Sequence, residues 1–154
     1  MDSKPRTEAT VSYLFGGPKE LRRDSKSIGI RAQAAVMNAL VRNGFWVSIP
    51  YGEKSRYDLV ADDGERLYRI QVKTGQDHGS YLRYSCSSSC AHRGRSLPSC
   101  HGELEYVAIY CAPRESVYLI PEAELTAPHG HLRYSQPENG QKKRIRWAGQ
   151  YELL

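Results

Sequence analysis

The sequence has no long apolar run and no apolar leader. None of its hydrophobic stretches approaches the length needed to cross a membrane, and the mean hydropathy is −0.62. The first residues are polar and lack the apolar segment of a secretory signal. These absences argue against a helical membrane protein and against export, so we expect a cytoplasmic protein.

Repeats and two common kinds of catalytic loop are also missing. There is no internal repeat and no long low-complexity tract, which excludes solenoid architectures. We find no Gly-rich loop of the nucleotide-binding type and no Ser–His–Asp order. Any catalytic chemistry must therefore come from another arrangement of polar residues.

Cysteine is scarce, with four residues in a chain of 154. Without an export signal, reduced thiols or a bound metal are favoured over disulfides. Cys86, Cys90, Cys100 and His101 lie in one Ser- and Arg-rich stretch and are candidate ligands of a structural zinc ion, with His92 as a further candidate. Their spacing matches no standard zinc signature, so a loop with incidental cysteines is the alternative.

The residues that are present are typical of one globular domain. Hydrophobic residues make up 40% of the chain and charged residues 25%, which suits a single core. The net charge of +5 favours a polyanionic partner such as nucleic acid, although many unrelated proteins share such an excess. We expect residues 1–19 to be a polar, partly disordered N-terminal segment and residues 20–154 to form the domain.

The hydrophobic pattern predicts one helix followed by several strands. Apolar residues recur at helical spacing from Asp24 onward, and Gly44 supplies the stop. Strands are expected at 45–50, 57–62, 66–74, 80–86, 105–111, 116–121, 131–135 and 144–148, and a short helix at 121–125. A loop is expected at 85–102, and a polar turn at His129 to His131. This order indicates an α/β (α+β) domain with one central sheet.

A hairpin in the middle of the chain carries polar residues that are able to meet. Asp58 precedes an Asp-Gly turn, and Gln71 and Lys73 follow it. Because side chains alternate along a strand, the right register would bring all three together. A carboxylate, an amide oxygen and a backbone carbonyl, here that of Val72, are hard ligands suited to Mg²⁺. On spacing alone, an exposed hairpin face with a charge pair is the favoured alternative.

The motifs "RYDLV" and "YRIQVKTG" resemble the PD-(D/E)XK nuclease pattern. More closely, the chain is similar to the group I intron-associated homing endonucleases of that superfamily. The similarity includes "ALVRNGFWVSIPYGEKSRYDLV", "GELEYVAIYCAPRESVYLIP" and "LRYSQPENGQKKRIRWAGQYEL" and covers roughly residues 20–154. It implies a restriction-endonuclease-like fold, with a leading helix packed on a central mixed sheet, and a Mg²⁺-dependent DNA endonuclease that would also accept Mn²⁺.

The resemblance implies a role for each site residue. Asp58 would be the principal metal ligand, with Gln71 and the Val72 carbonyl as further ligands, and Lys73 would position the nucleophile. Gln33 stands where the family's leading helix usually carries Glu, so Asp58 is the only anion of the predicted set. A DNA-binding module that does not cleave, and a junction-resolving nuclease, are therefore retained as alternatives.

The implied partner is double-stranded DNA. Basic residues that we expect to contact its phosphates are Arg93, Arg95, Lys142, Lys143 and Arg144. One such site cuts one strand, so cleavage of both strands requires at least a dimer. No membrane partner is expected.

Overall fold

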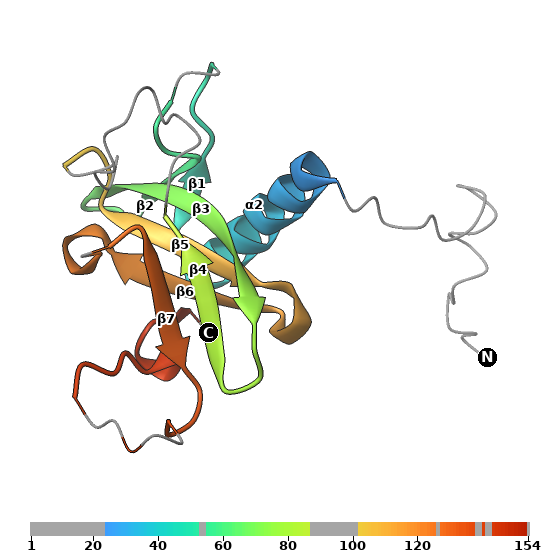
Figure 1. Ribbon diagram of the computed structural model, residues 1–154. Helices are drawn as coiled ribbons and strands as arrows, with labels where there is room; N and C mark the ends of the chain where they lie inside the picture. The colour runs from blue at the N-terminus through green and yellow to red at the C-terminus, as the bar shows by residue number, and fades with distance from the viewer. Residues whose placement is uncertain are drawn as a thin grey trace, which may run out of the picture.

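The computed structural model describes residues 24–52, 55–86, 102–125, 127–137, 140 and 143–153 (Figure 1). The elements in chain order are α2 (Ser25–Arg42), β1 (Trp46–Ser48), β2 (Leu59–Asp62), β3 (Leu67–Asp77), β4 (Tyr81–Ser85), β5 (Tyr106–Cys111), η1 (Ala112–Arg114), β6 (Ser116–Pro121), η2 (Glu122–Glu124), β7 (His129–Arg133), η3 (Ala148–Gln150) and β8 (Glu152–Leu153). The predicted domain boundary at residue 20 lies outside the described residues and stays a prediction.

Helix α2 forms where the periodic apolar pattern predicted it. Asp24 caps its start, because the Asp24 carboxylate accepts hydrogen bonds from the Ser27 backbone N–H at 2.9 Å and from the Ser27 hydroxyl at 2.7 Å. The helix ends before Gly44, whose φ of +86° lets the chain reverse. Ala32, Val36 and Leu40 are buried against the sheet. No helix among the described residues is both long and apolar enough to span a membrane.

The central sheet is mixed, as expected. Its strand order is β1-β2-β3-β5-β6-β8, in which β3 and β5 run parallel and the other neighbours run antiparallel. Strand β3 is longer than predicted and runs to Asp77. Its last residues pair with β4, and β4 pairs in turn with β7. The long strand therefore joins the central sheet to a β4–β7 ribbon (Figure 1).

Two hydrophobic layers cover the two faces of the central sheet. Helix α2 packs on one face, where Val36 and Leu40 meet Leu59, Ile70 and residues of β5 and β6. The β4–β7 ribbon covers part of the other face, and its inward side chains are Leu82, Tyr84 and Leu132. At Gly75, a Cβ atom would lie 2.5 Å from Leu82 Cδ1, so glycine permits the close approach of β4 to β3.

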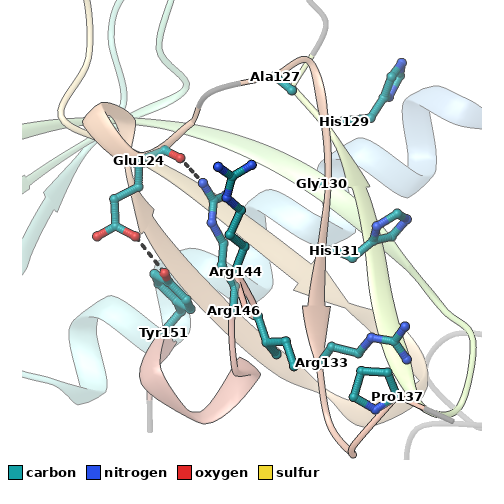
Figure 2. A pocket seen from close by; sticks show the side chains of 11 residues that line it. Glu124, Ala127, His129, Gly130, His131, Arg133, Pro137, Arg144, Arg146 and Tyr151 are labelled. Atoms are coloured by element: carbon teal, nitrogen blue, oxygen red, sulfur yellow. Dashed lines mark hydrogen bonds between the residues drawn. The ribbon is translucent and has the colours of Figure 1, made fainter. Parts of the chain in front are cut away.

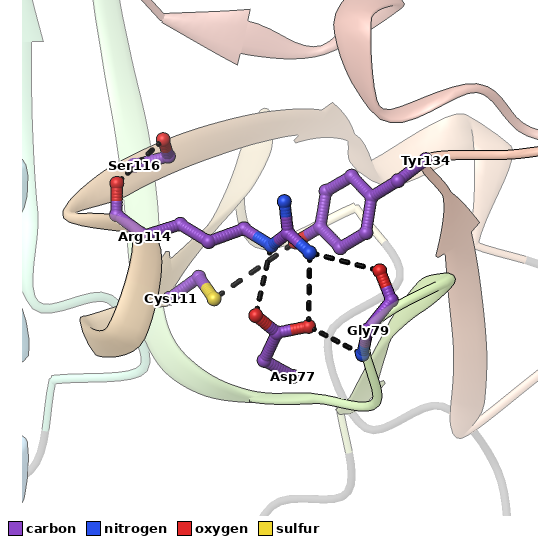
Figure 3. A network of polar contacts seen from close by, with 6 residues as sticks. All are labelled: Asp77, Gly79, Cys111, Arg114, Ser116 and Tyr134. Atoms are coloured by element: carbon purple, nitrogen blue, oxygen red, sulfur yellow. Dashed lines mark hydrogen bonds and ion pairs between the residues drawn. The ribbon is translucent and has the colours of Figure 1, made fainter.

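A polar network fixes the end of β3 against the β5–β6 turn (Figure 3). The Arg114 guanidinium donates to the Asp77 carboxylate at 2.8 Å and to the Gly79 carbonyl at 2.8 Å. It also lies 3.7 Å from the centre of the Tyr134 ring, and the Tyr134 hydroxyl donates to Cys111 Sγ at 3.8 Å. Burial raises the pKa of Tyr134, which keeps this phenol protonated. The network holds the β3–β4 turn in one position relative to the central sheet.

For the C-terminal part, two expectations were wrong, and a third, the short helix, was confirmed. The predicted strand at 144–148 is absent, because Trp147 makes only an isolated bridge to Arg133 and η3 begins at Ala148. The short helix predicted at 121–125 forms as the 3₁₀ helix Glu122–Glu124. The histidines around Gly130 form the start of β7 instead of a turn, because this segment pairs with β4; the Tyr84 ring packs where a side chain at Gly130 would stand.

Candidate active site

A tight turn sets the register of the β2–β3 hairpin. The Asp62 carboxylate accepts a hydrogen bond from the Gly64 N–H at 2.8 Å, and the Asp63 carboxylate accepts from the Arg66 N–H at 2.7 Å. Gly64 has a φ of +92°, which favours glycine. In this register Leu59 lies opposite Ile70, and both side chains point toward α2. Asp58, the residue before Leu59, therefore lies beside the β3 segment around Gln71.

The Asp58 carboxylate lies against the main chain of β3. The Asp58 N–H donates to the Ile70 carbonyl at 2.9 Å, and Asp58 Oδ2 accepts from the Val72 N–H at 2.7 Å. The Asp58 carboxylate thus replaces the main-chain carbonyl that would accept from the Val72 N–H if β2 were longer. Because the N–H and C=O of one strand residue point to the same side, the Val72 carbonyl also points toward this edge.

Two glutamine side chains hold the chain on either side of Tyr57. Gln33, on α2, donates from Nε2 to the Asp58 carbonyl at 3.2 Å. Gln71, on β3, donates from Nε2 to the Arg56 carbonyl at 3.3 Å. Gln71 is only 9% exposed, so its amide is held in a largely dry environment. The two amides fix the backbone that carries the Asp58 carboxylate.

Lys73 lies on the same face of β3 as Gln71, two residues further along. It is half-buried and lines a hollow of about 410 Å³. The hollow is bounded by Lys73, Thr74, Gln76, Arg83, Tyr84, Ser85 and His129. The lysine side chain therefore opens toward the β4–β7 ribbon.

The neighbouring carboxylates are engaged in ion pairs. Glu105 accepts from the Arg69 N–H at 2.6 Å and from Arg69 Nη2 at 2.6 Å, and this hydrogen bonding lowers the pKa of Glu105. Glu103 pairs with Arg56 at 3.0 Å. Within the described ranges, no group of three or more His, Cys, Asp or Glu side chains is placed to hold a metal ion. Among the predicted site residues, Asp58 is the one acid.

The PD-(D/E)XK endonuclease family model matches residues 23–154. The chain belongs to the PD-(D/E)XK endonuclease family. This confirms the resemblance seen in the motifs around Asp58 and Lys73 and makes the protein a member of a nuclease family. Nucleases of this family generally use divalent metal ions. No curated protein sequence matches the chain.

Two solved structures are similar to this PD-(D/E)XK chain. The bacterial homing endonuclease I-Ssp6803I matches with a TM-score of 0.62 and 20% identity over 84% of this chain and 87% of that one. Hjc, a Holliday junction resolvase from Archaeoglobus fulgidus, matches with a TM-score of 0.43 and 23% identity over 75% of this chain and 91% of that one. The first match confirms the restriction-endonuclease-like fold.

The structure unites some of the predicted site residues of this PD-(D/E)XK domain and leaves others outside the described ranges. Asp58, Val72, Gln71 and Gln33 lie together through the hydrogen bonds above, and Lys73 follows them on β3. Lys143 and Arg144 are exposed. Cys86 is buried in the core beneath the ribbon. Arg93, Arg95, Lys142, Cys90, Cys100, His101 and His92 lie outside the described residues.

Sequence reasoning missed the basic residues of the β4–β7 ribbon. Arg83, His131 and Arg133 share one side of that ribbon with His129. The alternation in "YLRYS" and "HGHLR" indicates that the basic residues share an exposed face, because Leu82 and Leu132 point inward and their neighbours point outward. The pairing of these two distant segments is what the sequence did not show.

Proposed function

We propose that this protein is a Mg²⁺-dependent DNA endonuclease that hydrolyses phosphodiester bonds in double-stranded DNA. The observation that carries the proposal is the 2.7 Å hydrogen bond from the Val72 N–H to the Asp58 carboxylate. It brings an acid, a main-chain carbonyl and the Gln71–Lys73 segment to one edge of β3. The family to which the chain belongs supports the same chemistry.

The donor set fits a hard divalent ion. Asp58 supplies a carboxylate, Val72 a main-chain carbonyl and Gln71 an amide oxygen, and Mg²⁺ or Mn²⁺ takes such oxygen ligands. A carboxylate that accepts one hydrogen bond retains further acceptor positions. The bound ion would orient the scissile phosphate and lower the pKa of a bound water. With one acid in the set, we expect weaker ion binding than in an acid-rich site.

The remaining catalytic roles would belong to side chains of the protein. Lys73, with three donor hydrogens, would hold the attacking water and offset negative charge that develops on the phosphate. Gln33 and Gln71 would act as positioning residues, because their amides fix the backbone at Asp58 and Arg56. Attack would be in line with the leaving oxygen. Since one site cuts one strand, we propose that double-strand cleavage uses a homo-oligomer.

The experiment is a plasmid-nicking assay in Mg²⁺ and in Mn²⁺, with a chelator blank. Wild type is compared with Asp58→Ala and Lys73→Ala, and linear and four-way-junction DNA are tested beside the plasmid. Glu65→Ala and Lys26→Ala are matched controls, since both residues are exposed and neither is among the predicted site residues. We expect each site variant to lose about 10²- to 10³-fold in rate, and both controls to cut like wild type. Equal nicking by the wild type and both site variants would rule the proposal out.

A second candidate function is DNA binding without cleavage. Two observations favour it: Asp58 is the one acid of the set, and Gln33 presents its Nε2 donor to the Asp58 carbonyl, whereas a metal ligand would present an oxygen lone pair to the ion. This function predicts DNA binding that is indifferent to Mg²⁺ and survives Asp58→Asn, together with no nicking in either metal.

A further inference from the structure

The β4–β7 ribbon has two chemically different faces. Its inward side chains, among them Leu82, Tyr84 and Leu132, are buried against the central sheet. The register pairs Tyr81 with Arg133, Arg83 with His131, and Ser85 with His129. We call these six residues, Tyr81, Arg83, Ser85, His129, His131 and Arg133, the outer face of the ribbon.

The outer face carries positive and aromatic groups and no acid. Tyr81 is stacked on His78 with ring centres 4.8 Å apart, and the Arg133 guanidinium lies 5.1 Å from the Tyr81 ring. The His131 and Tyr81 rings are nearly perpendicular, with their centres 5.0 Å apart. Burial, Arg83 and Arg133 together lower the pKa of His131, as expected where positive charges lie close without an anion between them.

Two hollows connect this face to the candidate active site and to the C-terminal arginines. His129 borders the 410 Å³ hollow that also contains Lys73 and Arg83. It borders a second hollow of about 760 Å³ as well, whose lining includes Arg133 and Arg144 (Figure 2). A basic track therefore runs from Lys73 over the outer face to Arg144.

Not every arginine on the track is available for a ligand. Arg146 donates to the Glu124 carbonyl (Figure 2) and to the Tyr84 hydroxyl at 2.9 Å, so it stabilises the fold. The Glu124 carboxylate accepts from the Tyr151 hydroxyl at 2.6 Å. Arg83 is exposed, and Arg133 is held by the Tyr81 ring with its guanidinium on the outer face. Arg83 and Arg133 are thus the residues best placed to meet an anion.

We propose that the outer face of the β4–β7 ribbon docks duplex DNA, with Arg83 and Arg133 contacting backbone phosphates of the strand that leads to Lys73. A two-stranded ribbon is narrow enough to enter a major groove, which is about 12 Å wide, and paired arginines match the charge of the phosphates flanking it. That the bound strand leads to Lys73 rests on the proposed function, whereas docking of the duplex on the outer face does not require cleavage.

The test measures binding separately from cutting. Fluorescence anisotropy of a labelled mixed-sequence duplex is followed in chelator from about 50 to about 200 mM salt, with wild type and Asp58→Asn as parents. Arg83→Gln and Arg133→Gln are each expected to weaken binding and to reduce the slope of log affinity against log salt by about 1, and the double variant by about 2. Arg83→Lys should keep the slope, because it keeps the charge.

Arg42→Gln is the matched control. Arg42 is an exposed arginine in the last turn of α2, which packs on the opposite face of the central sheet. We expect its slope and affinity to equal those of wild type. Circular dichroism melts verify that each variant is folded.

Several results would overturn the docking proposal. These are unchanged slopes in both arginine variants, an equal loss in Arg42→Gln, no DNA binding by wild type, tighter binding of single-stranded RNA than of the duplex, or a change in oligomeric state that accounts for the effect. If the slopes fall as expected but wild type never nicks DNA, the docking surface stands and the proposed cleavage fails. If wild type nicks DNA and the slopes do not change, the proposed cleavage stands and the docking surface fails.

Discussion

Replacing Gln33 with Glu tests directly how the leading helix supports the site. The Gln33 amide donates to the Asp58 carbonyl at 3.2 Å in a half-buried contact. A carboxylate cannot donate this hydrogen bond, and it places a negative charge beside the carbonyl oxygen. A neutral hydrogen bond contributes about 1 kcal/mol, so we expect Gln33→Glu to lower the free energy of unfolding in chelator by about 1 to 2 kcal/mol.

Magnesium should reverse this deficit if the site binds the ion. The substitution adds a second carboxylate near Asp58, and carboxylates raise affinity for hard cations. An ion present at about 100 times its dissociation constant adds about 2.7 kcal/mol to stability. At a concentration that saturates the variant but not wild type, Gln33→Glu should become the more stable protein and should nick DNA faster.

The assay is urea unfolding over a Mg²⁺ titration, beside the plasmid assay. Gln33→Leu is the matched control: it loses the same hydrogen bond without gaining charge, so Mg²⁺ should not reverse its deficit. The reasoning fails if Gln33→Glu is as stable as wild type in chelator. It also fails if the deficit of Gln33→Glu is unchanged by Mg²⁺, because Gln33 would then not border an ion site.

Two further predictions concern packing and acid stability. Gly130→Ala should lower the free energy of unfolding by about 1 to 3 kcal/mol, because its Cβ overlaps the Tyr84 ring. In a Tyr84→Ala background this destabilisation should largely disappear. Equal destabilisation in the two backgrounds, measured by urea unfolding, would contradict the proposed contact. Hydrogen bonding to Arg69 lowers the pKa of Glu105, so the stabilisation from this ion pair is present above the carboxyl's ordinary pKa of 4.5 and is lost as pH falls through the lower folded-state pKa. Glu105→Gln should therefore lose less stability than wild type over that acid range, and superimposable pH profiles would count against the ion pair.

Much of the fold follows from local patterns. Helix α2 was predicted because its apolar residues recur at helical spacing and Gly44 ends it, and both features depend only on neighbouring residues. The β5–β6 hairpin was predicted for the same reason, since two β-rich runs are separated by a short polar turn. The residue types around Asp58 and Lys73 indicated the family, which the family model confirms.

The pairing of the β4–β7 ribbon could not be predicted from such patterns. Alternation shows which residues of a strand share a face, but it does not show which strand lies beside it. The extension of β3 to Asp77, its pairing with β4, and the pairing of β4 with β7 depend on contacts between distant segments. The predicted strand at 144–148 failed for the same reason, because its alternating pattern has a partner only at Trp147.

By itself, the sequence determined the leading helix, most of the strands, the family and the residue types available to the site. Only the tertiary structure decided that the Asp58 carboxylate takes the Val72 N–H, that Gln33 acts as a donor, and that the outer face of the β4–β7 ribbon adjoins Lys73. The physical reason is that propensity and capping act between near neighbours, whereas register and strand pairing are settled by which buried surfaces fit together.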